Sequence, residues 1–274
     1  MKRILIGLTT AGAVLGLTLI ATNAFFSDVE TSSGNTFTAG SLDLKIDSTA
    51  HYAGLVCDKD THVWTGTSLT RLDLVGNSCD GSWVAKDLNG ERFFNLADIK
   101  PGDSGENTIS IEVTNNPAYA CAAIYNMIDS ENGRTEPEIA LNDPDNTTGE
   151  LSQEIKFFAW ADTNGNNIWD SGESILFTNI SGPASDVLGG KIYPIALPTP
   201  GPITPNTPKF IGLYWCYGTL TATQGVNANP NTLSCSGVGG TNITQSDSLS
   251  ANIRFYIEQA RNNDTFVCPT SLTQ

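Results

Sequence analysis

The sequence predicts an all-β protein built as an antiparallel sandwich, and two observations lead to this fold class. Apolar and polar residues alternate with a period of two in several segments, which is typical of strands that bury one face. These segments are separated by long loops rich in Asn, Gly and Pro, and long amphipathic helices are scarce. The clearest strand is expected at residues 249–257, where every second residue is apolar.

Other segments extend this pattern along the chain. Alternation predicts strands at residues 42–46 and 109–113, and short apolar or aromatic runs predict further strands at 120–127, 155–161, 174–177 and 210–217. Short helices are expected at 185–189 and within 130–152. The proline-rich residues 194–208 should be extended and unable to join the middle of a sheet, because proline lacks a backbone donor. Residues 50–90 are interpreted as a loop-rich insertion.

The amino-terminal end predicts export. An apolar run at residues 4–20 follows Lys2 and Arg3, and small residues precede a cleavage site expected between Ala24 and Phe25. An uncleaved membrane anchor is the alternative, since no charge interrupts residues 4–27. We therefore expect a signal peptide at residues 1–24 that a signal peptidase removes. The protein is then secreted to the extracellular matrix or the cell surface, and it meets the membrane only during export.

Bulk composition narrows the possible partners. Without residues 1–24, 250 of the 274 residues remain, which suits one β domain with a sizeable core. The formal net charge of −15 disfavours nucleic acid and anionic lipid as partners and favours divalent cations. Plain solvation of the surface is the simpler explanation of this charge. The sequence gives no sign of a small-molecule substrate.

Six cysteines in an exported chain predict disulfides rather than a metal site, because no C-x-x-C pair is present. Cys57 and Cys79 flank one short irregular stretch and are expected to pair. Two further bridges are expected among the remaining four cysteines, although the sequence permits many pairings. Of these, Cys121 and Cys216 lie in strand-like runs that could be neighbours, which would leave Cys235 to pair with Cys268.

The twelve residues 162–173 have the spacing of a calcium-binding loop. Side-chain oxygens occupy positions 1, 3, 5, 9 and 12, and position 7 offers a backbone carbonyl, so the predicted ligands are Asp162, Asn164, Asn166, Ile168, Asp170 and Glu173. Asn167 replaces the usual glycine at position 6 and tolerates the left-handed backbone that the turn needs. Because strands are expected on both sides of the loop, a bound calcium ion would stabilise a β-hairpin rather than the helix pair of an EF-hand. The alternative is an ion-free turn whose Asx side chains bond their own backbone.

A second pair of acidic residues, Asp143 and Asp145 around Pro144, is interpreted as a solvated turn rather than a cation site.

Three segments resemble the TasA/camelysin family of exported biofilm-matrix proteins: residues 24–28 with 35–44, residues 94–103, and residues 248–263. The resemblance implies a jelly-roll-like sandwich, here a single domain at residues 38–274 with the insertion at about 50–90. It also implies that subunits polymerise into extracellular fibres, because the amino-terminal segment of one subunit supplies a strand to the next.

The candidate donor strand spans residues 25–37, with Phe25, Phe26, Val29 and Phe37 as its apolar anchors. The polar residues between these anchors also fit a loose terminus. Donor and groove lie on different faces, so the contact is head-to-tail and yields a filament of this chain with itself.

Two other function classes remain open at this stage. Some camelysin-type relatives are called metalloproteases, but the chain contains only His51 and His62 and no H-E-x-x-H motif, so we expect no catalytic residues and no enzyme. A monomeric adhesin or glycan-binding module is the other alternative, because exposed tryptophans stack on sugars. The five tryptophans are more often packed in the core or at its rim.

Overall fold

The computed structural model describes residues 41–141, 143, 147–177, 182–225, 233–239 and 242–271. The chain divides into two compact units, Met1–Ser41 and Leu42–Gln274, and every described residue except Ser41 belongs to the second unit. The predicted signal peptide, its cleavage site at Ala24 and Phe25, and the predicted donor segment 25–37 lie outside the described residues.

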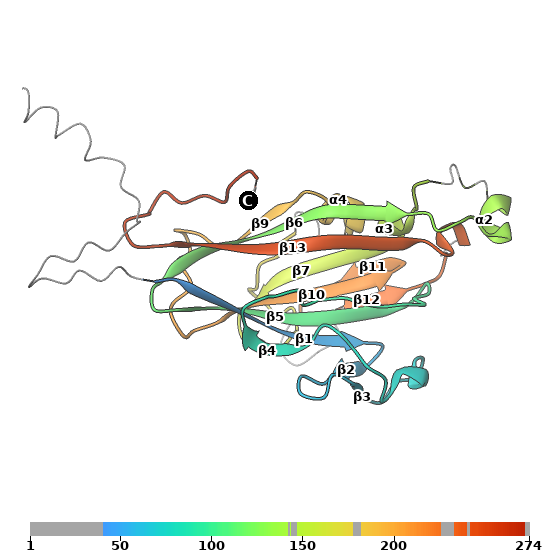
Figure 1. Cartoon of the computed structure of the whole chain (residues 1–274), viewed down its shortest axis with the longest axis horizontal. Coiled ribbons are helices and arrows are strands. Elements are labelled where there is room, and N and C mark those ends of the chain that lie inside the picture. Colours follow the sequence, from blue (N-terminus) through green and yellow to red (C-terminus); the bar gives the residue numbers. More distant parts are fainter. Residues whose placement is uncertain are drawn as a thin grey trace, which may run out of the picture. The chain divides into compact units, whose positions relative to one another are not determined.

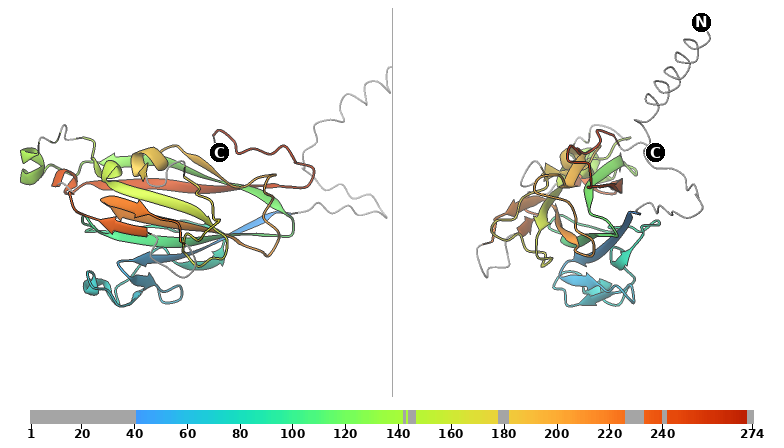
Figure 2. Two further views of the ribbon diagram at one scale, coloured as in Figure 1. Left: turned by 180° about the vertical axis from the view of Figure 1, so that it is seen from behind. Right: turned by 90° about the vertical axis from the view of Figure 1, so that its left-hand side faces the viewer.

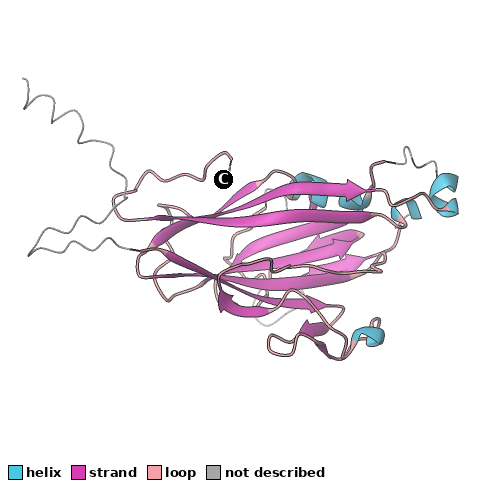
Figure 3. Ribbon diagram, in the orientation of Figure 1, coloured by secondary structure: helices cyan, strands magenta, loops and turns pink. Residues whose placement is uncertain are grey.

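Antiparallel strands are the main secondary structure of the described chain (Figures 1 and 3). The larger sheet has the strand order β3-β2-β1-β5-β10-β7-β8, and β4 pairs with β1 beside β2. Its strands are β1 (Asp43–Tyr52), β2 (Leu55–Cys57), β3 (Trp64–Gly66), β4 (Trp83–Lys86), β5 (Ser104–Thr114), β7 (Ile155–Asp162), β8 (Gly182–Pro183) and β10 (Lys209–Tyr217).

The smaller sheet has three strands in the order β13-β6-β9, and a separate hairpin joins β11 to β12. These strands are β6 (Ala118–Ser130), β9 (Ile192–Ala196), β11 (Thr219–Ala222), β12 (Leu233–Ser236) and β13 (Ser248–Gln259). Short helices connect the strands: η1 (Leu72–Leu74), α2 (Glu136–Ala140), α3 (Leu151–Glu154), α4 (Ala184–Val187) and η2 (Asn242–Thr244). Helices are therefore confined to the loops, as the sequence predicts.

The two sheets pack face to face around one main core. Ile46 and Ile111 of the larger sheet are buried in the same apolar cluster as Ala120 and Ile124 of the smaller sheet. The outer faces carry smaller clusters of their own. The β11–β12 hairpin covers Trp160 and Cys216 on the outside of the larger sheet, and the carboxyl-terminal tail covers Cys121 on the outside of the smaller sheet (Figure 2). The antiparallel all-β class is confirmed, and the jelly-roll order of strands stays a prediction.

Most of the predicted strands are confirmed, with one exception. The segments predicted at 42–46, 109–113, 120–127, 155–161, 210–217 and 249–257 lie within β1, β5, β6, β7, β10 and β13. The strand predicted at 174–177 is wrong, since only an isolated bridge between Trp160 and Ile175 forms there. Among the described residues, the segment follows the edge of β7 through only two backbone hydrogen bonds, from Ala161 to Ser174 and from Leu176 to Ala159, and β8 pairs with the start of β7.

The proline-rich segment agrees with its prediction at Pro194, whereas the insertion at 50–90 differs from its prediction. Pro194 lies in β9, which pairs only with β6 among the described strands, so it occupies a sheet edge as expected. The insertion at 50–90 is more ordered than the sequence predicts. Its short strands β2, β3 and β4 extend the larger sheet beyond β1.

The disulfides correct part of the sequence analysis. Cys57 pairs with Cys79 as predicted. The pairing of Cys121 with Cys216 is wrong, because these side chains lie in separate clusters on the outer faces of opposite sheets. Each instead bonds to the segment that covers its own sheet: the bridges are Cys121–Cys268 and Cys216–Cys235.

Gly212 in β10 lies where the neighbouring strand leaves no room for a side chain. It pairs with Trp160 across β10 and β7, and a Cβ atom on Gly212 would lie 2.1 Å from the indole carbons of Trp160. Trp160 is 0 % exposed and has no space to move away. Only glycine fits at this position.

Gly212→Ala should therefore lower the free energy of unfolding by about 3 kcal/mol or more, because it overpacks a rigid contact. Gly189→Ala is the matched control, since its Cβ would meet the flexible end of Met127 at 3.1 Å. We expect the control to change stability by less than about 0.5 kcal/mol. Urea unfolding followed by tryptophan fluorescence measures both variants, and equal stability of the two would contradict this account of the packing.

Candidate functional site

The most prominent functional feature of the described chain is the outer edge of β13. Among the described strands, β13 pairs with β6 alone, so the N–H and C=O groups on its other side have no strand partner. It is also the longest strand with a free side: β3 has 3 residues, β8 has 2, and β9 has 5 including Pro194. A long unpaired edge is a template for another strand.

A groove runs beside this edge, between the smaller sheet and the start of β1. It has a volume of about 330 Å³ and is lined by the apolar or aromatic side chains of Leu44, Ile46, Leu88, Tyr125, Ile253 and Phe255 together with the charged residues Asp87 and Arg254. Four of these, Leu44, Leu88, Ile253 and Phe255, are only half-buried although they pack against the main core. The groove therefore combines an unpaired backbone edge with apolar surface that the described residues leave partly uncovered.

The sequence analysis identified the strands of this groove but not the groove itself. Leu44 and Phe255 are more than 200 positions apart along the chain, and only the packing of β1 beside β13 brings them together. The available signal was the alternation at residues 249–257, which predicts an exposed strand without saying whether a neighbour pairs with it.

The predicted calcium loop closes around its own first residue. The carboxylate of Asp162, which is 1 % exposed, accepts hydrogen bonds from the amides of Gly165 at 2.7 Å, Asn166 at 3.3 Å and Asn167 at 2.7 Å. Asn167 has a φ of 59°, so the predicted left-handed turn at position 6 is confirmed. Asp162 therefore organises the first half of the loop.

Glu173, the last residue of the loop, ties its two ends together. Its Oε1 accepts hydrogen bonds from the amide of Thr163 at 2.5 Å and the hydroxyl of Thr163 at 2.8 Å, and its Oε2 accepts one from the amide of Asp170 at 3.0 Å. The loop is anchored further by Gln224, whose Nε2 donates to the carbonyls of Asp170 and Glu173. Both carboxylates at the loop ends are thus fixed by backbone donors.

The side chains at positions 3, 5 and 9 converge. The Nδ2 atoms of Asn164 and Asn166 both donate to Oδ2 of Asp170, at 3.0 and 2.9 Å. A half-turn of each carboxamide would exchange its nitrogen for its oxygen at this shared centre. The carbonyl of Ile168 lies at the predicted position 7 of the same loop. These residues therefore fit the ligand set of a calcium loop, and they form the Asx turns of the ion-free alternative equally well.

The acidic residue Asp143 differs from its prediction. Its side chain is 0 % exposed and pairs with Nε of Arg134 at 2.8 Å, so it is not part of a solvated turn. The ion pair compensates the burial, which the local sequence does not reveal. Asp145 lies outside the described residues.

The histidines and tryptophans limit the alternative functions. His51 lies on β1 with its Nδ1 3.9 Å from Glu106, and burial lowers the pKa of His51. His62 is exposed in a turn, and neither histidine belongs to the group of acidic side chains that the described residues bring within metal-binding distance of one another. All five tryptophans are buried, so none offers an open face to a sugar: Trp64, Trp83, Trp160, Trp169 and Trp215.

Comparison with protein-family models gives a match at the amino-terminal end. The model of the family described as camelysin metallo-endopeptidases, which includes TasA-like proteins, matches residues 1–53. The resemblance to the camelysin family is confirmed for these residues. The camelysin match spans the predicted signal peptide, the predicted donor segment and β1. No curated protein matches the chain. Among the described residues, no helix has the length and apolarity needed to cross a bilayer.

Proposed function

We propose that this chain is a secreted structural subunit that polymerises into extracellular fibres by donating its amino-terminal segment to the next subunit. The observation that carries the proposal is the free edge of β13 beside a groove that exposes half-buried apolar side chains. An added strand would gain main-chain hydrogen bonds along β13 and would place alternate side chains in the groove. The camelysin match supports the proposal, since it covers the segment proposed as the donor.

The donor segment has a sequence that suits this groove. Phe25, Val29 and Phe37 have the same parity, so they would point to one face of an extended strand. Asp28 and Glu30 would then point to the opposite face and remain in solvent. Phe26 shares the parity of these acidic residues and is the weakest of the proposed anchors.

Donation between subunits produces a fibre for a geometric reason. The donor belongs to one surface of a subunit and the groove belongs to another, so each contact leaves one free donor and one free groove. Repetition of this head-to-tail contact extends an open filament. Membrane contact is proposed only for export, and a signal peptidase would free the donor segment.

A structural role without catalysis is proposed over the protease alternative. The family name favours a metallo-endopeptidase, yet a zinc protease of the H-E-x-x-H type needs two histidines on one helical turn, and His51 lies on β1 while His62 lies in a turn. Hydrolysis of casein that a chelator abolishes would favour the protease. Binding to a glycan array without polymerisation would favour the adhesin.

The loop at residues 162–173 is proposed to bind calcium with the weak affinity of extracellular modules, about 10⁻⁴ to 10⁻³ M. Asp162, Asn164, Asn166, Asp170 and Glu173 would supply side-chain oxygens, and Ile168 would supply its carbonyl. The ion would stabilise the connection that follows β7. It supplies rigidity and no reaction chemistry.

Two defective forms of the protein test strand donation together. A form that begins at Thr38 has a groove but no donor, and a form that begins at Phe25 with Phe255→Glu has a donor but a blocked groove. Each should stay monomeric alone, whereas the unmodified Phe25 form makes filaments visible by electron microscopy. Mixed together, the two defective forms should stop at a 1:1 dimer, because they share one working contact.

Leu69→Glu in the Phe25 form is the control for Phe255→Glu, since Leu69 is fully exposed in the insertion, at 102 %. It should polymerise normally. Filaments from the Thr38 form, or no dimer in the mixture while both forms remain folded by circular dichroism, would overturn strand donation.

A melting scan tests the calcium loop. Calcium at about 10 mM should raise the midpoint by several degrees, since the ion binds only the folded state. Glu173→Gln should lose much of this shift, because it removes a ligand charge. Asp162→Ala should lose it too, and should also destabilise the ion-free protein by about 1–3 kcal/mol by leaving three amides without their acceptor. An unchanged calcium response in both variants would remove the ion from this loop.

A further inference from the structure

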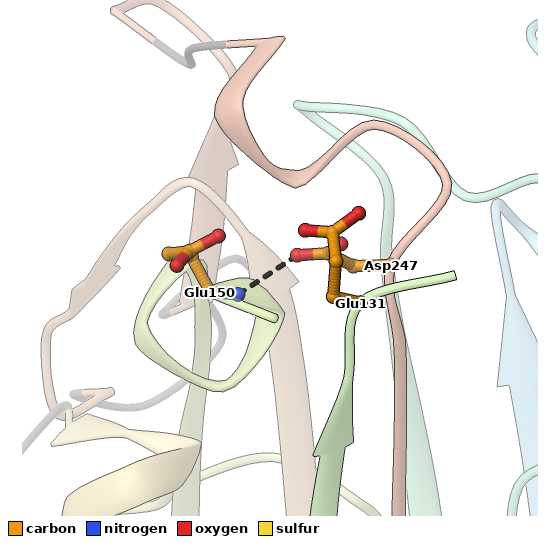
Figure 4. Close-up of side chains that lie close together, drawn as sticks. All are labelled: Glu131, Glu150 and Asp247. Atoms are coloured by element: carbon orange, nitrogen blue, oxygen red, sulfur yellow. Dashed lines mark hydrogen bonds between the residues drawn. The ribbon is translucent and has the colours of Figure 1, made fainter. Parts of the chain in front are cut away.

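A cluster of carboxylates lies at the end of the smaller sheet, away from the predicted calcium loop. Glu131 directly follows β6, Asp247 directly precedes β13, and Glu150 precedes α3. One carboxylate oxygen from each lies within 4.8 Å of the others (Figure 4). These three residues are named here the ladder-end cluster.

The sheet register forces two of these acids together. Ser130 pairs with Ser248 at the end of the β6–β13 ladder, so Glu131 and Asp247 are opposite each other immediately beyond it. Like charges at opposing positions repel. The loop bearing Glu150 then approaches from a third direction, and the amide of Glu150 donates to Oδ2 of Asp247 at 2.8 Å.

The loop that carries Glu150 can approach Asp247 and Ser130 because residue 149 is a glycine. Gly149 is buried, and a Cβ atom at this position would lie 2.9 Å from Oδ2 of Asp247 and 3.0 Å from the carbonyl carbon of Ser130. Any larger residue would push the loop away from the carboxylates. The close contact between this loop and Asp247 therefore depends on Gly149.

A further buried carboxylate faces the same region. Glu138 in α2 is 0 % exposed, and its Oε1 has no hydrogen-bond partner among the described residues. Burial is the main reason that the pKa values of Glu131 and Asp247 are raised, and the negative charge of Glu138 adds to both shifts. Oε2 of Glu138 accepts a hydrogen bond from the amide of Thr135, so only part of the cost of burying this charge is compensated, and a nearby cation would reduce the remainder.

The ion pairs of the described residues leave Glu131 and Asp247 without a positive partner. Arg134 is paired with Asp143 at 2.8 Å, and no ion pair joins Glu131 or Asp247 to a lysine or arginine among the described residues. Oxygen ligands of one calcium ion, each about 2.3–2.6 Å from it, lie within about 5 Å of one another. The spacing of the cluster matches that limit.

We propose that Glu131, Glu150 and Asp247 bind a calcium ion that fastens the loop before α3 to the ends of β6 and β13. Glu138 adds negative charge behind the ion. Because β13 is the proposed acceptor strand, the ion would also fix one end of that strand. The site is separate from the loop at 162–173 and does not depend on strand donation.

The test compares calcium-induced melting shifts in four chains. In about 10 mM calcium, relative to chelator, we expect the unmodified chain to gain about 3–10 °C from this site. Glu131→Gln with Asp247→Asn should lose that gain, and it should melt higher than the unmodified chain in chelator, since it removes the repulsion. Asp60→Asn with Asp186→Asn changes two exposed charges and is the control, with a normal calcium shift.

The fourth chain, Glu173→Gln, separates the two calcium sites, because it should retain the shift that comes from the ladder-end cluster. An equal calcium shift in the cluster variant and its control would overturn the proposal. Sodium chloride at matched ionic strength gives the second check. If it reproduces the calcium shift in the unmodified chain, charge screening explains the effect and the site is refuted.

Discussion

The proposed assembly depends on one physical feature, the unpaired side of β13. A strand of 12 residues that pairs on one side only leaves a row of backbone donors and acceptors beside half-buried apolar side chains. Natural sheets protect such edges with proline, charge, short length or a covering segment. The larger sheet ends in the short strands β3 and β8, and β9 contains Pro194. Because β13 is longer than these edge strands and contains no proline, we propose it as the edge that accepts a partner strand.

Disulfides brace the sandwich to which this edge belongs. Both outer faces of the sandwich are covered, and each cover is held to its sheet by a disulfide: Cys216–Cys235 holds the β11–β12 hairpin, and Cys121–Cys268 holds the carboxyl-terminal tail. Such bridges typically contribute about 2–4 kcal/mol each, chiefly by restricting the unfolded chain. A groove with fixed walls loses little entropy when a strand enters it, which favours tight assembly.

Features that depend on neighbouring residues could be predicted from the sequence. Alternation located β1, β5 and β13, and the contiguous spacing of residues 162–173 located a loop whose backbone has the predicted turn at Asn167. Features that depend on tertiary packing could not be predicted. The partner of Cys121 is set by which outer face its strand presents, and Glu131, Glu150 and Asp247 meet only because the β6–β13 register and a loop at Gly149 bring them together.

The central claim is that the amino-terminal segment of one subunit completes the smaller sheet of another. An atomic map of the natural filament by electron cryomicroscopy tests it most directly. We expect residues 25–37 of one subunit to lie along β13 of the next, with Phe25, Val29 and Phe37 directed into the groove lined by Leu44, Ile253 and Phe255. A map in which this segment folds back onto its own subunit, or in which another chain segment pairs with β13, would contradict the account.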